Sequence, residues 1–401
     1  MADILERTGL PALSRLAWVE VDLDALIGNA RALAELAAPA ALGVVVKADG
    51  YGHGLEMAAR AAVTGGASWL CVADAAEALR LRADGYEGRV FVLYPVPASA
   101  APEMATASVD ITVGTSGHAH EFANTETKQP ISVHLEIDTG MTRGGVSPSD
   151  APTVANILMG GPHTRLAGVW THLASPEDPG ATTTQMARFE ATLAALRDAG
   201  VDPGVVHAAA SGGLLTLDVS SHSLVRPGLV FYGTHPGAGG PLPEEVRPAI
   251  AVKAHPVRIV TVAPGTRVGY AGTWVATRES VIATLPIGYA DGWSRSSAGS
   301  EVLIDGSRVP VVGRISSDSL TVDVTDVPGV GFDTEFTLLG DSEAETIDAD
   351  EVARVRGTIS WEVLQQLGAR LSRVFRSGGV PVAVRGESTT HVGIAGEVPG
   401  Y

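Results

Sequence analysis

The residue of this sequence best suited to covalent chemistry is Lys47, which ends an apolar run. Lysine is scarce here, because only three of the 28 basic residues are lysines. A lysine can lose its proton and form an imine with a carbonyl compound, whereas an arginine cannot. Directly after Lys47, residues 50–54 alternate glycine with Tyr51 and His53, so a loop would hold a hydroxyl and an imidazole beside the amine. We therefore predict a reactive, imine-forming lysine rather than one that is ion-paired at a strand end.

A repeating pattern of strands and helices predicts how this lysine is positioned. From residue 42 to about residue 226, short apolar runs alternate with amphipathic stretches of helical length, and such repeats form parallel sheets. The expected strands are 43–46, 68–73, 89–93, 109–113, 131–137, 166–171, 205–207 and 223–225. The expected helices include 55–63, 75–83, 116–124, 153–159 and 184–199. This α/β pattern, without a long interruption, favours a closed (β/α)8 barrel over an open doubly wound sheet, with the site at the carboxyl ends of the strands.

The chain changes character after residue 233. A stretch rich in glycine and proline spans residues 234–243, and β-rich segments punctuated by turns follow it. We therefore expect two domains, a (β/α)8 barrel over residues 1–237 and a mostly β domain over residues 238–401. The expected strands of the second domain are 251–262, 280–286, 301–304, 309–312, 320–324 and 335–339.

Composition and charge exclude several classes of protein. The chain has 45 acidic and 28 basic residues and a net charge of −17, so its surface would repel nucleic-acid phosphates and anionic lipid headgroups. No stretch of about 18 apolar residues escapes a charge or a proline, and the first residues lack the apolar core of a signal peptide. The single cysteine, Cys71, lies in an apolar run where a buried thiol is usual. We expect a cytoplasmic protein that binds neither nucleic acid nor membranes.

The segment 46–54 has the sequence Val-Lys-Ala-Asp-Gly-Tyr-Gly-His-Gly. It resembles the cofactor-lysine motif of the alanine racemases, which are pyridoxal 5'-phosphate enzymes with a barrel domain followed by a β domain. Further segments that match the family in the same order are 134–143, 168–172, 225–228, 268–270, 285–292 and 357–359. The resemblance covers about residues 14 to 380. It implies a homodimeric enzyme with shared active sites that interconverts L- and D-alanine.

The resemblance implies a pair of bases that act on opposite faces of the amino-acid substrate. Lys47 would hold the cofactor as an imine and act on one face, and Tyr270 of the partner subunit would act on the other. Racemisation needs such a pair, because a proton leaves Cα on one side of a planar intermediate and returns from the other. Arg226 would contact the ring nitrogen of the cofactor, to which a guanidinium donates a hydrogen bond without giving up a proton.

The remaining site residues also follow from the resemblance. Tyr51, Ser211 and the backbone N–H groups at Gly228 and Leu229 would hold the phosphate, and a helix N-terminus at Ser211 would favour an anion. The other residues that the resemblance places at the site are His172 and Trp361 beside the cofactor, Arg143 and Ser317 beside the substrate, and Tyr289, Arg314 and Asp318 around the entrance.

The sequence departs from the family at several positions. Glu136 stands where many members have a carbamylated lysine, and we expect its carboxylate to replace the carbamate by pairing directly with Arg143. We predict no carbamylation at position 136. The pocket differs from the family's usual residues at four further positions, which are Ala210, Ser316, Ser317 and Trp361. A racemase of serine or of another amino acid, with the same mechanism, is therefore an alternative.

Three other functions are weaker alternatives. Related decarboxylases place a cysteine of the β domain over the cofactor, whereas Cys71 lies in an expected barrel strand. Related D-threonine aldolases need a metal ion, and His118 with His120 is a poor ligand pair, since residues i and i+2 do not face one another on a helix. We expect no metal. A non-catalytic pyridoxal-phosphate-binding protein would need Lys47 but not Tyr270, and it is the alternative from a different functional class.

Overall fold

The computed structural model describes residues 1–386, 392–396 and 398–401 of the chain, which divides into two compact units. The barrel unit comprises Ala25–Gly50, Ala58–Arg247 and Pro399–Tyr401. The β unit comprises Met1–Asp24, Tyr51–Met57 and Pro248–Val398. Each unit thus combines segments that are distant in sequence, and a domain boundary after residue 237 stays a prediction.

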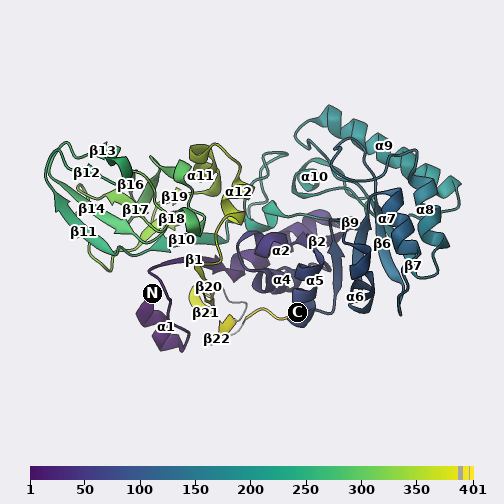
Figure 1. Ribbon diagram of the computed structural model, residues 1–401, viewed down its shortest axis with the longest axis horizontal. Helices are drawn as coiled ribbons and strands as arrows, with labels where there is room; N and C mark the ends of the chain where they lie inside the picture. Colours follow the sequence, from purple (N-terminus) through teal and green to yellow (C-terminus); the bar gives the residue numbers. More distant parts are fainter. Residues whose placement is uncertain (387–391, 397) are drawn as a thin grey trace. The chain divides into compact units, whose positions relative to one another are not determined.

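Within the described residues, eight parallel strands form the sheet of the barrel unit (Figure 1). They are β2 (Ala41–Val45), β3 (Trp69–Val72), β4 (Arg89–Val92), β5 (Val109–Val113), β6 (Ile131–Glu136), β7 (Thr164–Trp170), β8 (Val205–His207) and β9 (Leu224–Val225). Strands that follow one another from β2 to β8 pair, and β9 pairs with β2 through Ala41 and Leu224. Between β8 and β9, the N–H of Ser223 donates to the carbonyl of Val206 at 2.9 Å. The sheet returns to its first strand, and the predicted (β/α)8 barrel is confirmed.

Helices follow most of these strands and cover the outside of the sheet (Figure 1). The helices in or leading into the barrel unit are α2 (Leu23–Ala37), α3 (Lys47–Tyr51), α4 (Leu55–Thr64), α5 (Ala75–Ala83), α6 (Ala101–Thr106), α7 (Ser116–Ala123), α8 (Ala151–Gly160), α9 (Pro179–Asp198) and α10 (Ser211–Thr216), with the 3-10 turns η1 (Ala98–Ala100) and η2 (Leu229–Tyr232). Asp74 caps α5, Thr115 caps α7, and Asp178 caps α9, which therefore starts earlier than expected. None of the helices in the described parts of the chain is long and apolar enough to span a bilayer.

The described part of the β unit contains a 12-stranded sheet and a two-stranded ribbon. Its strands are β1 (Ala17–Asp22), β10 (Ile250–Ala254), β11 (Arg258–Val262), β12 (Arg267–Val268), β13 (Trp274–Val275), β14 (Ser280–Leu285), β15 (Glu301–Ile304), β16 (Ser307–Val312), β17 (Leu320–Asp323), β18 (Phe336–Ser342), β19 (Glu345–Ile347), β20 (Ser372–Ser377), β21 (Val380–Arg385) and β22 (Val392–Ile394). The unit also holds α1 (Ala2–Thr8), α11 (Ala349–Arg356), α12 (Ser360–Gln365), η3 (Tyr270–Gly272), η4 (Tyr289–Asp291) and η5 (Arg295–Ser297). The predicted, mostly β second domain is confirmed.

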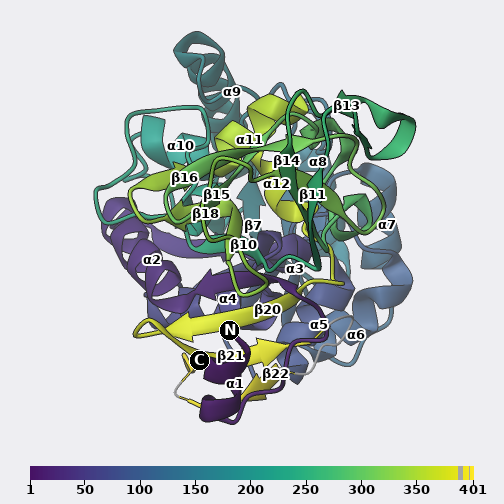
Figure 2. The same ribbon diagram turned by 90° about the vertical axis from the view of Figure 1, so that its left-hand side faces the viewer.

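Two features of the β unit differ from expectation. The segment expected as one strand over residues 251–262 is split into β10 and β11, because Pro256 has no N–H to donate to a neighbouring strand. The strand β1, which was not expected, pairs antiparallel with β10 and parallel with β20. Figure 2 shows β20 and β21 side by side in this sheet. Long-range pairing therefore brings the N-terminal segment into a sheet built otherwise from the second half of the chain.

Candidate functional site

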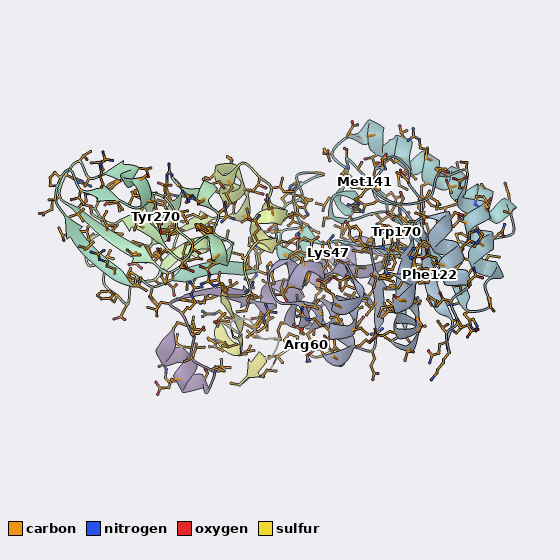
Figure 3. All side chains as sticks on the ribbon, in the orientation of Figure 1. Lys47, Arg60, Phe122, Met141, Trp170 and Tyr270 are labelled. Atoms are coloured by element: carbon orange, nitrogen blue, oxygen red, sulfur yellow. The ribbon has the colours of Figure 1, made fainter. Side chains whose placement is uncertain are left out.

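Lys47 lies just beyond the carboxyl end of β2, where a barrel presents its loops (Figure 3). Two contacts fix the end of this strand. The N–H of Val46 donates to the carbonyl of Cys71 at 2.8 Å, and the carbonyl of Val45 accepts from the hydroxyl of Tyr232 at 3.1 Å. Hydrogen bonds to β3 and to η2 therefore hold the two residues before Lys47, and they fix the position of the backbone that carries the amine.

The surroundings of Lys47 favour its neutral form. Its side chain is partly buried, and burial, followed by the charge of Arg143, lowers the pKa of Lys47, while Glu77 raises it. The amine nitrogen lies 5.5 Å from the centre of the Tyr94 ring, and the guanidinium carbon of Arg143 lies 5.6 Å from the same ring. Tyr94 thus attracts both cations through its ring face. The sequence did not single out Tyr94, although it follows β4 by two residues just as Lys47 follows β2.

Arg226 follows the last barrel strand, β9, and is 1% exposed. Its guanidinium donates to Nδ1 of His207 at 2.5 Å and to the carbonyl oxygens of Thr171 at 2.9 Å and Ala208 at 3.3 Å. Burial lowers the pKa of Arg226 to about 10, so the side chain stays protonated at neutral pH. Among the described residues no carboxylate forms an ion pair with it. Arg226 is therefore a buried cation held by neutral acceptors, and it can donate to a further neutral acceptor.

Two buried histidines extend the contacts of Arg226 through the barrel interior. Because a guanidinium only donates, Nδ1 of His207 must accept, and its Nε2 then carries the proton and donates to Nδ1 of His134 at 2.8 Å. Nε2 of His134 consequently carries a proton and faces Asp110 at 3.7 Å, while Arg89 donates to the same carboxylate at 2.9 Å. Burial keeps the pKa of both histidines below its usual value. In this series of side chains, each N–H therefore points away from Arg226 and towards Asp110.

We expect His207→Phe to lower the free energy of unfolding by about 1–3 kcal/mol, because it leaves a buried guanidinium N–H without its acceptor. His207→Asn is the matched control, since its amide oxygen can accept near the position of Nδ1 and should restore part of the lost stability. Urea unfolding of the two full-length variants measures the difference. Equal losses in both variants would mean that ring packing, and not the hydrogen bond from Arg226, stabilises this region.

Backbone donors gather where the seventh and eighth barrel strands, β8 and β9, end. The hydroxyl of Ser211 accepts from the N–H groups of Gly228 at 2.9 Å and Val230 at 3.4 Å, which ties the start of α10 to the start of η2. The first N–H groups of a helical turn have no acceptor within that turn. Loops after the seventh and eighth strands frequently bind phosphate in (β/α)8 barrels. The structure thus brings together Ser211, Gly228 and Leu229, three residues expected at a phosphate.

His172 and Glu136 lie at the ends of the neighbouring strands β7 and β6. Burial, followed by nearby cationic side chains, lowers the pKa of His172 to about 3, so this imidazole is neutral. Burial raises the pKa of Glu136 to about 7, against the effects of Arg143 and Arg226. The direct ion pair expected between Glu136 and Arg143 does not occur among the contacts of the described residues, because the exposed Arg143 lies over Tyr94 instead. Glu136 and Arg143 are coupled through their charges without a direct contact.

We expect Glu136→Gln to gain stability relative to the unchanged protein as the pH rises from about 4.5 to about 7. Over this range the folded protein keeps a proton on Glu136 that the unfolded chain has lost, so ionisation opposes folding. Below pH 4.5 this pH-dependent gain in the free energy of unfolding of Glu136→Gln vanishes. Above pH 7 the gain should level off at about 3 kcal/mol. The free energy of unfolding measured against pH tests this, with the exposed Glu103→Gln as control. A difference that does not change with pH would contradict the raised pKa.

In the β unit, Tyr270 lines a pocket of ≈ 420 Å³. Arg314 and Ser316 also line this pocket, and the side chain of Tyr270 is 68% exposed. Gly269, directly before Tyr270, has a φ of 74°, and a Cβ there would approach the backbone nitrogen of Arg314 to 3.1 Å. Glycine at this position therefore allows the Tyr270 loop to lie against the segment that carries Arg314.

The loops of Tyr289 and Ser317 lie against each other in the same unit. The N–H of Tyr289 donates to the carbonyl of Ser316 at 3.1 Å, and that of Ala290 donates to the carbonyl of Ser317 at 3.0 Å. A Cβ on Gly288 would come within 2.5 Å of the Ser317 oxygen, so only glycine permits this approach. Backbone contacts thus group two expected site residues that are 28 positions apart in the chain.

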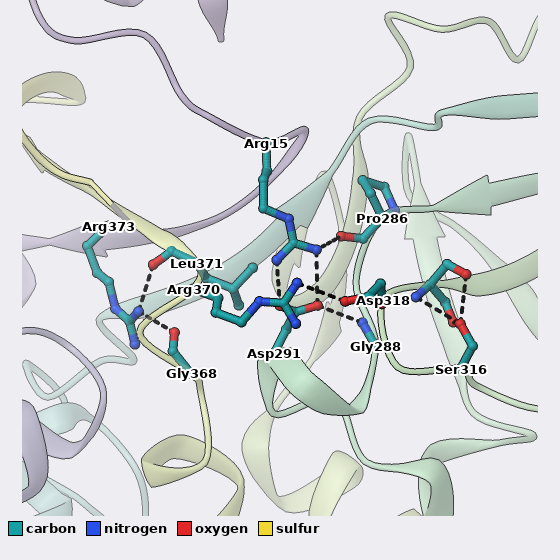
Figure 4. A network of polar contacts seen from close by, with 11 residues as sticks. Arg15, Pro286, Gly288, Asp291, Ser316, Asp318, Gly368, Arg370, Leu371 and Arg373 are labelled. Atoms are coloured by element: carbon teal, nitrogen blue, oxygen red, sulfur yellow. Dashed lines mark hydrogen bonds and ion pairs between the residues drawn. The ribbon is translucent and has the colours of Figure 1, made fainter. Parts of the chain in front are cut away.

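An ion-pair network supports Asp318 (Figure 4). Arg370 contacts Asp318 at 2.8 Å and the fully buried Asp291 at 3.5 Å. Asp291 also pairs with Arg15 at 2.5 Å and accepts from the N–H of Gly288 at 2.9 Å. The network therefore joins the N-terminal segment, the loop around residue 290 and the loop of Asp318.

The expected site residues fall into two groups. The barrel unit holds Lys47, Glu136, Arg143, His172, Ser211, Arg226, Gly228 and Leu229. The β unit holds Tyr51, Tyr270, Tyr289, Arg314, Ser317, Asp318 and Trp361. In the β unit, Tyr51 is 5% exposed, and Trp361 is partly buried in α12.

Comparisons with known proteins agree along the chain. The family model of the alanine racemase N-terminal domain matches residues 21–236, and that of the C-terminal domain matches residues 249–375. The alanine racemases of Desulfovibrio desulfuricans and Thermobifida fusca are 36% and 37% identical to this chain, and the matches cover 91% and 90% of it and 99% of each relative. The structure of alanine racemase from Bacillus anthracis with bound L-Ala-P matches with a TM-score of 0.88 and 33% identity, over 94% of this chain and 99% of that one. This chain belongs to the alanine racemase family.

Proposed function

We propose that this protein is a pyridoxal 5'-phosphate-dependent amino-acid racemase that interconverts L- and D-alanine. The observation that carries the proposal is the position of Lys47, an amine with a lowered pKa at the carboxyl end of a barrel strand. Relatives that match the chain over both family domains are alanine racemases by name.

The side chains of the barrel unit suit this cofactor. The hydroxyl of Ser211 and the N–H of Leu229, the first residue of η2, are donors suited to a phosphate. Arg226 would donate to the ring nitrogen and, with a pKa of about 10, would leave that nitrogen without a proton. Lys47 supplies the amine for the aldehyde, and the neutral His172 would lie beside the ring. When bound, the cofactor supplies an electron sink that makes the Cα proton of an amino acid removable. By family resemblance, Tyr51 and Trp361 would complete this binding site.

Two side chains would move the substrate proton. The Nζ atom of Lys47 would take or return it on one face of Cα, and the phenolic oxygen of Tyr270 would do so on the other. Tyr270 is 68% exposed in the β unit, so its hydroxyl is available to a second copy of the chain. We therefore propose a homodimer with shared active sites, in which Tyr270 of the partner subunit completes the pair.

The other expected residues would select and admit the substrate. Arg143 is an exposed cation close enough to influence the pKa of Lys47, and it would bind the amino-acid carboxylate. Ser317 would lie beside the substrate side chain, and Tyr289, Arg314 and Asp318 would line the entrance. Cys71 is a free, buried thiol, which is typical of a reducing compartment, and we propose the cytoplasm.

Proton exchange in heavy water tests the proposed function. The cofactor-loaded, full-length protein is incubated with a panel of L-amino acids, and deuterium at Cα is followed together with the chirality of the product. We expect deuterated D-alanine as the dominant product. Dominant exchange of serine would keep the mechanism and change the substrate, whereas no exchange with any amino acid would favour a non-catalytic binding protein.

A further inference from the structure

The turn that follows Lys47 has a strained backbone. Ala48, Asp49, Gly50 and Tyr51 have φ values of 53°, 54°, 62° and 51°. Glycine adopts this left-handed conformation freely, but a residue with a Cβ does so only at a cost in free energy. Three such residues in one turn persist only if contacts outside the turn compensate for the strain. The contacts that do so also determine where the Lys47 backbone points.

The helix α5 supplies these contacts through Glu77. One carboxylate oxygen of Glu77 accepts from the N–H of Ala48 at 2.6 Å and from that of Asp49 at 3.4 Å. The other oxygen accepts from the N–H of Ala73 at 2.9 Å. Hydrogen bonds to an ionised acceptor are stronger than those between neutral groups. A single carboxylate thus joins the turn after β2 to the segment after β3.

Arg80 holds the same turn from the same side of α5. Its guanidinium lies 3.3 Å from the carboxylate of Asp49. Residues 77 and 80 are three positions apart and therefore lie on one face of the helix. This face contacts the strained turn through the backbone N–H groups of Ala48 and Asp49 and through the side chain of Asp49.

The charge of Glu77 also acts on the amine of Lys47. Three other groups interact with this amine: Arg143 opposes its protonation, the Tyr94 ring lies 5.5 Å away, and His172 is neutral with a pKa lowered to about 3. Glu77 carries the negative charge in this set, and it favours the ammonium form. Burial raises the pKa of this carboxylate, whereas the hydrogen bonds from the N–H groups of Ala73, Ala48 and Asp49 lower it and favour the charged form.

We infer that Glu77 is the positioning residue of Lys47: its carboxylate binds the backbone directly after Lys47, fixes the left-handed turn that directs the amine, and places a negative charge at that turn. The inference rests on the proposed function, because there Lys47 is the reactive amine. Glu77 acts through Ala48 and Asp49, which it binds, and through its charge. Glu77 would therefore not contact the substrate, whereas Tyr270 would.

Titration of the lysines in Glu77→Gln tests the charge of Glu77. The amide has the size of the carboxylate and keeps one acceptor for Ala48, so the turn should stay in place. The full-length chain, with lysine isotope-labelled at its ε-carbon, is titrated by NMR, and its three lysines are resolved individually. We expect the titration midpoint of Lys47 to fall by about one pH unit. Lys128 and Lys253 should not change and serve as internal references.

Cofactor uptake by Glu77→Ala tests the turn. Loss of the three hydrogen bonds should slow attachment of pyridoxal 5'-phosphate to Lys47 by about tenfold or more, because the amine is misdirected. Borohydride treatment followed by peptide mass spectrometry measures the attachment. Asp74→Ala is the matched control: Asp74 caps α5 by accepting from the N–H of Glu77 at 2.9 Å, so its loss weakens the helix and leaves the Glu77 carboxylate in place. In Asp74→Ala, the Lys47 titration midpoint and the rate of cofactor attachment should be the same as in the protein without a substitution.

Two results would overturn the inference. One is an unchanged Lys47 midpoint in Glu77→Gln, and the other is equal slowing in Glu77→Ala and Asp74→Ala, which would assign the effect to helix stability. If the unchanged protein attaches no cofactor at Lys47, the proposed function fails. The NMR titration needs no cofactor, so in that case it still decides whether Glu77 acts on Lys47.

Discussion

Replacement of Lys47 by alanine should abolish racemisation, with a fall in kcat of about 10⁴-fold or more. The change removes the amine that attaches the cofactor and, with it, one of the two groups proposed to move the Cα proton. The same variant should give no borohydride-stable attachment of the cofactor to the protein. The rate of D-alanine formation and peptide mass spectrometry measure the two effects.

Two variants control for charge and for lysine content. Lys47→Arg keeps the positive charge, but its guanidinium stays protonated and cannot act as a base, so it should be as inactive as the alanine variant. Lys128→Ala removes an exposed lysine and should leave kcat unchanged. Attachment of the cofactor at Lys128, or full activity of Lys47→Ala, would refute the role given to Lys47.

Replacement of Tyr270 by phenylalanine should lower racemisation by about 10²- to 10⁴-fold without preventing cofactor attachment. The ring remains, and only the phenolic oxygen that would move the proton on one face is lost. In heavy water, one enantiomer of alanine should therefore still exchange its Cα proton through Lys47, without inversion. The other enantiomer should not exchange. Exchange rates and product chirality of the two enantiomers, measured separately, test this asymmetry.

Hybrid dimers test whether Tyr270 acts on the site of the partner subunit. Mixing Lys47→Ala chains with Tyr270→Phe chains would give hybrid dimers in which one site has both residues and the other has neither. If subunits exchange at random, about a quarter of the unchanged activity should return, since half of the dimers are hybrids with one complete site each. No recovery, despite proven subunit exchange, would place Tyr270 and Lys47 of one site on the same chain.

The barrel could be predicted because each of its repeats leaves a local pattern in the sequence. The strands expected at residues 109–113 and 205–207 coincide with β5 and β8, since each is a short, mostly apolar segment between stretches of helical or turn character. The strand β1 could not be predicted in this way. It pairs with β10 and β20, and the apolar pattern of a segment does not record which distant segment it joins.

The reactive lysine could also be predicted, because its residue type and its place after a strand are both local. Tyr94 occupies the equivalent place after β4, but nothing local marks a tyrosine there as a partner of two cations. The pairing of Glu136 with Arg143 stays a prediction, because no direct contact joins them among the described residues. Proximity in the chain does not determine which way a side chain turns, and Arg143 turns towards the Tyr94 ring.

The sequence by itself determined the barrel, the following β domain, the likeness to a family and the position of Lys47. Only the tertiary structure decided how these parts are supported. The hydrogen bonds from Arg226 through His207 to His134 connect the residue after β9 with β8 and β6, and the carboxylate of Glu77 connects two loops. The physical reason is that strand and helix patterns depend on burial and period along the chain. The partner of a buried charge depends instead on the register in which the strands close into a barrel.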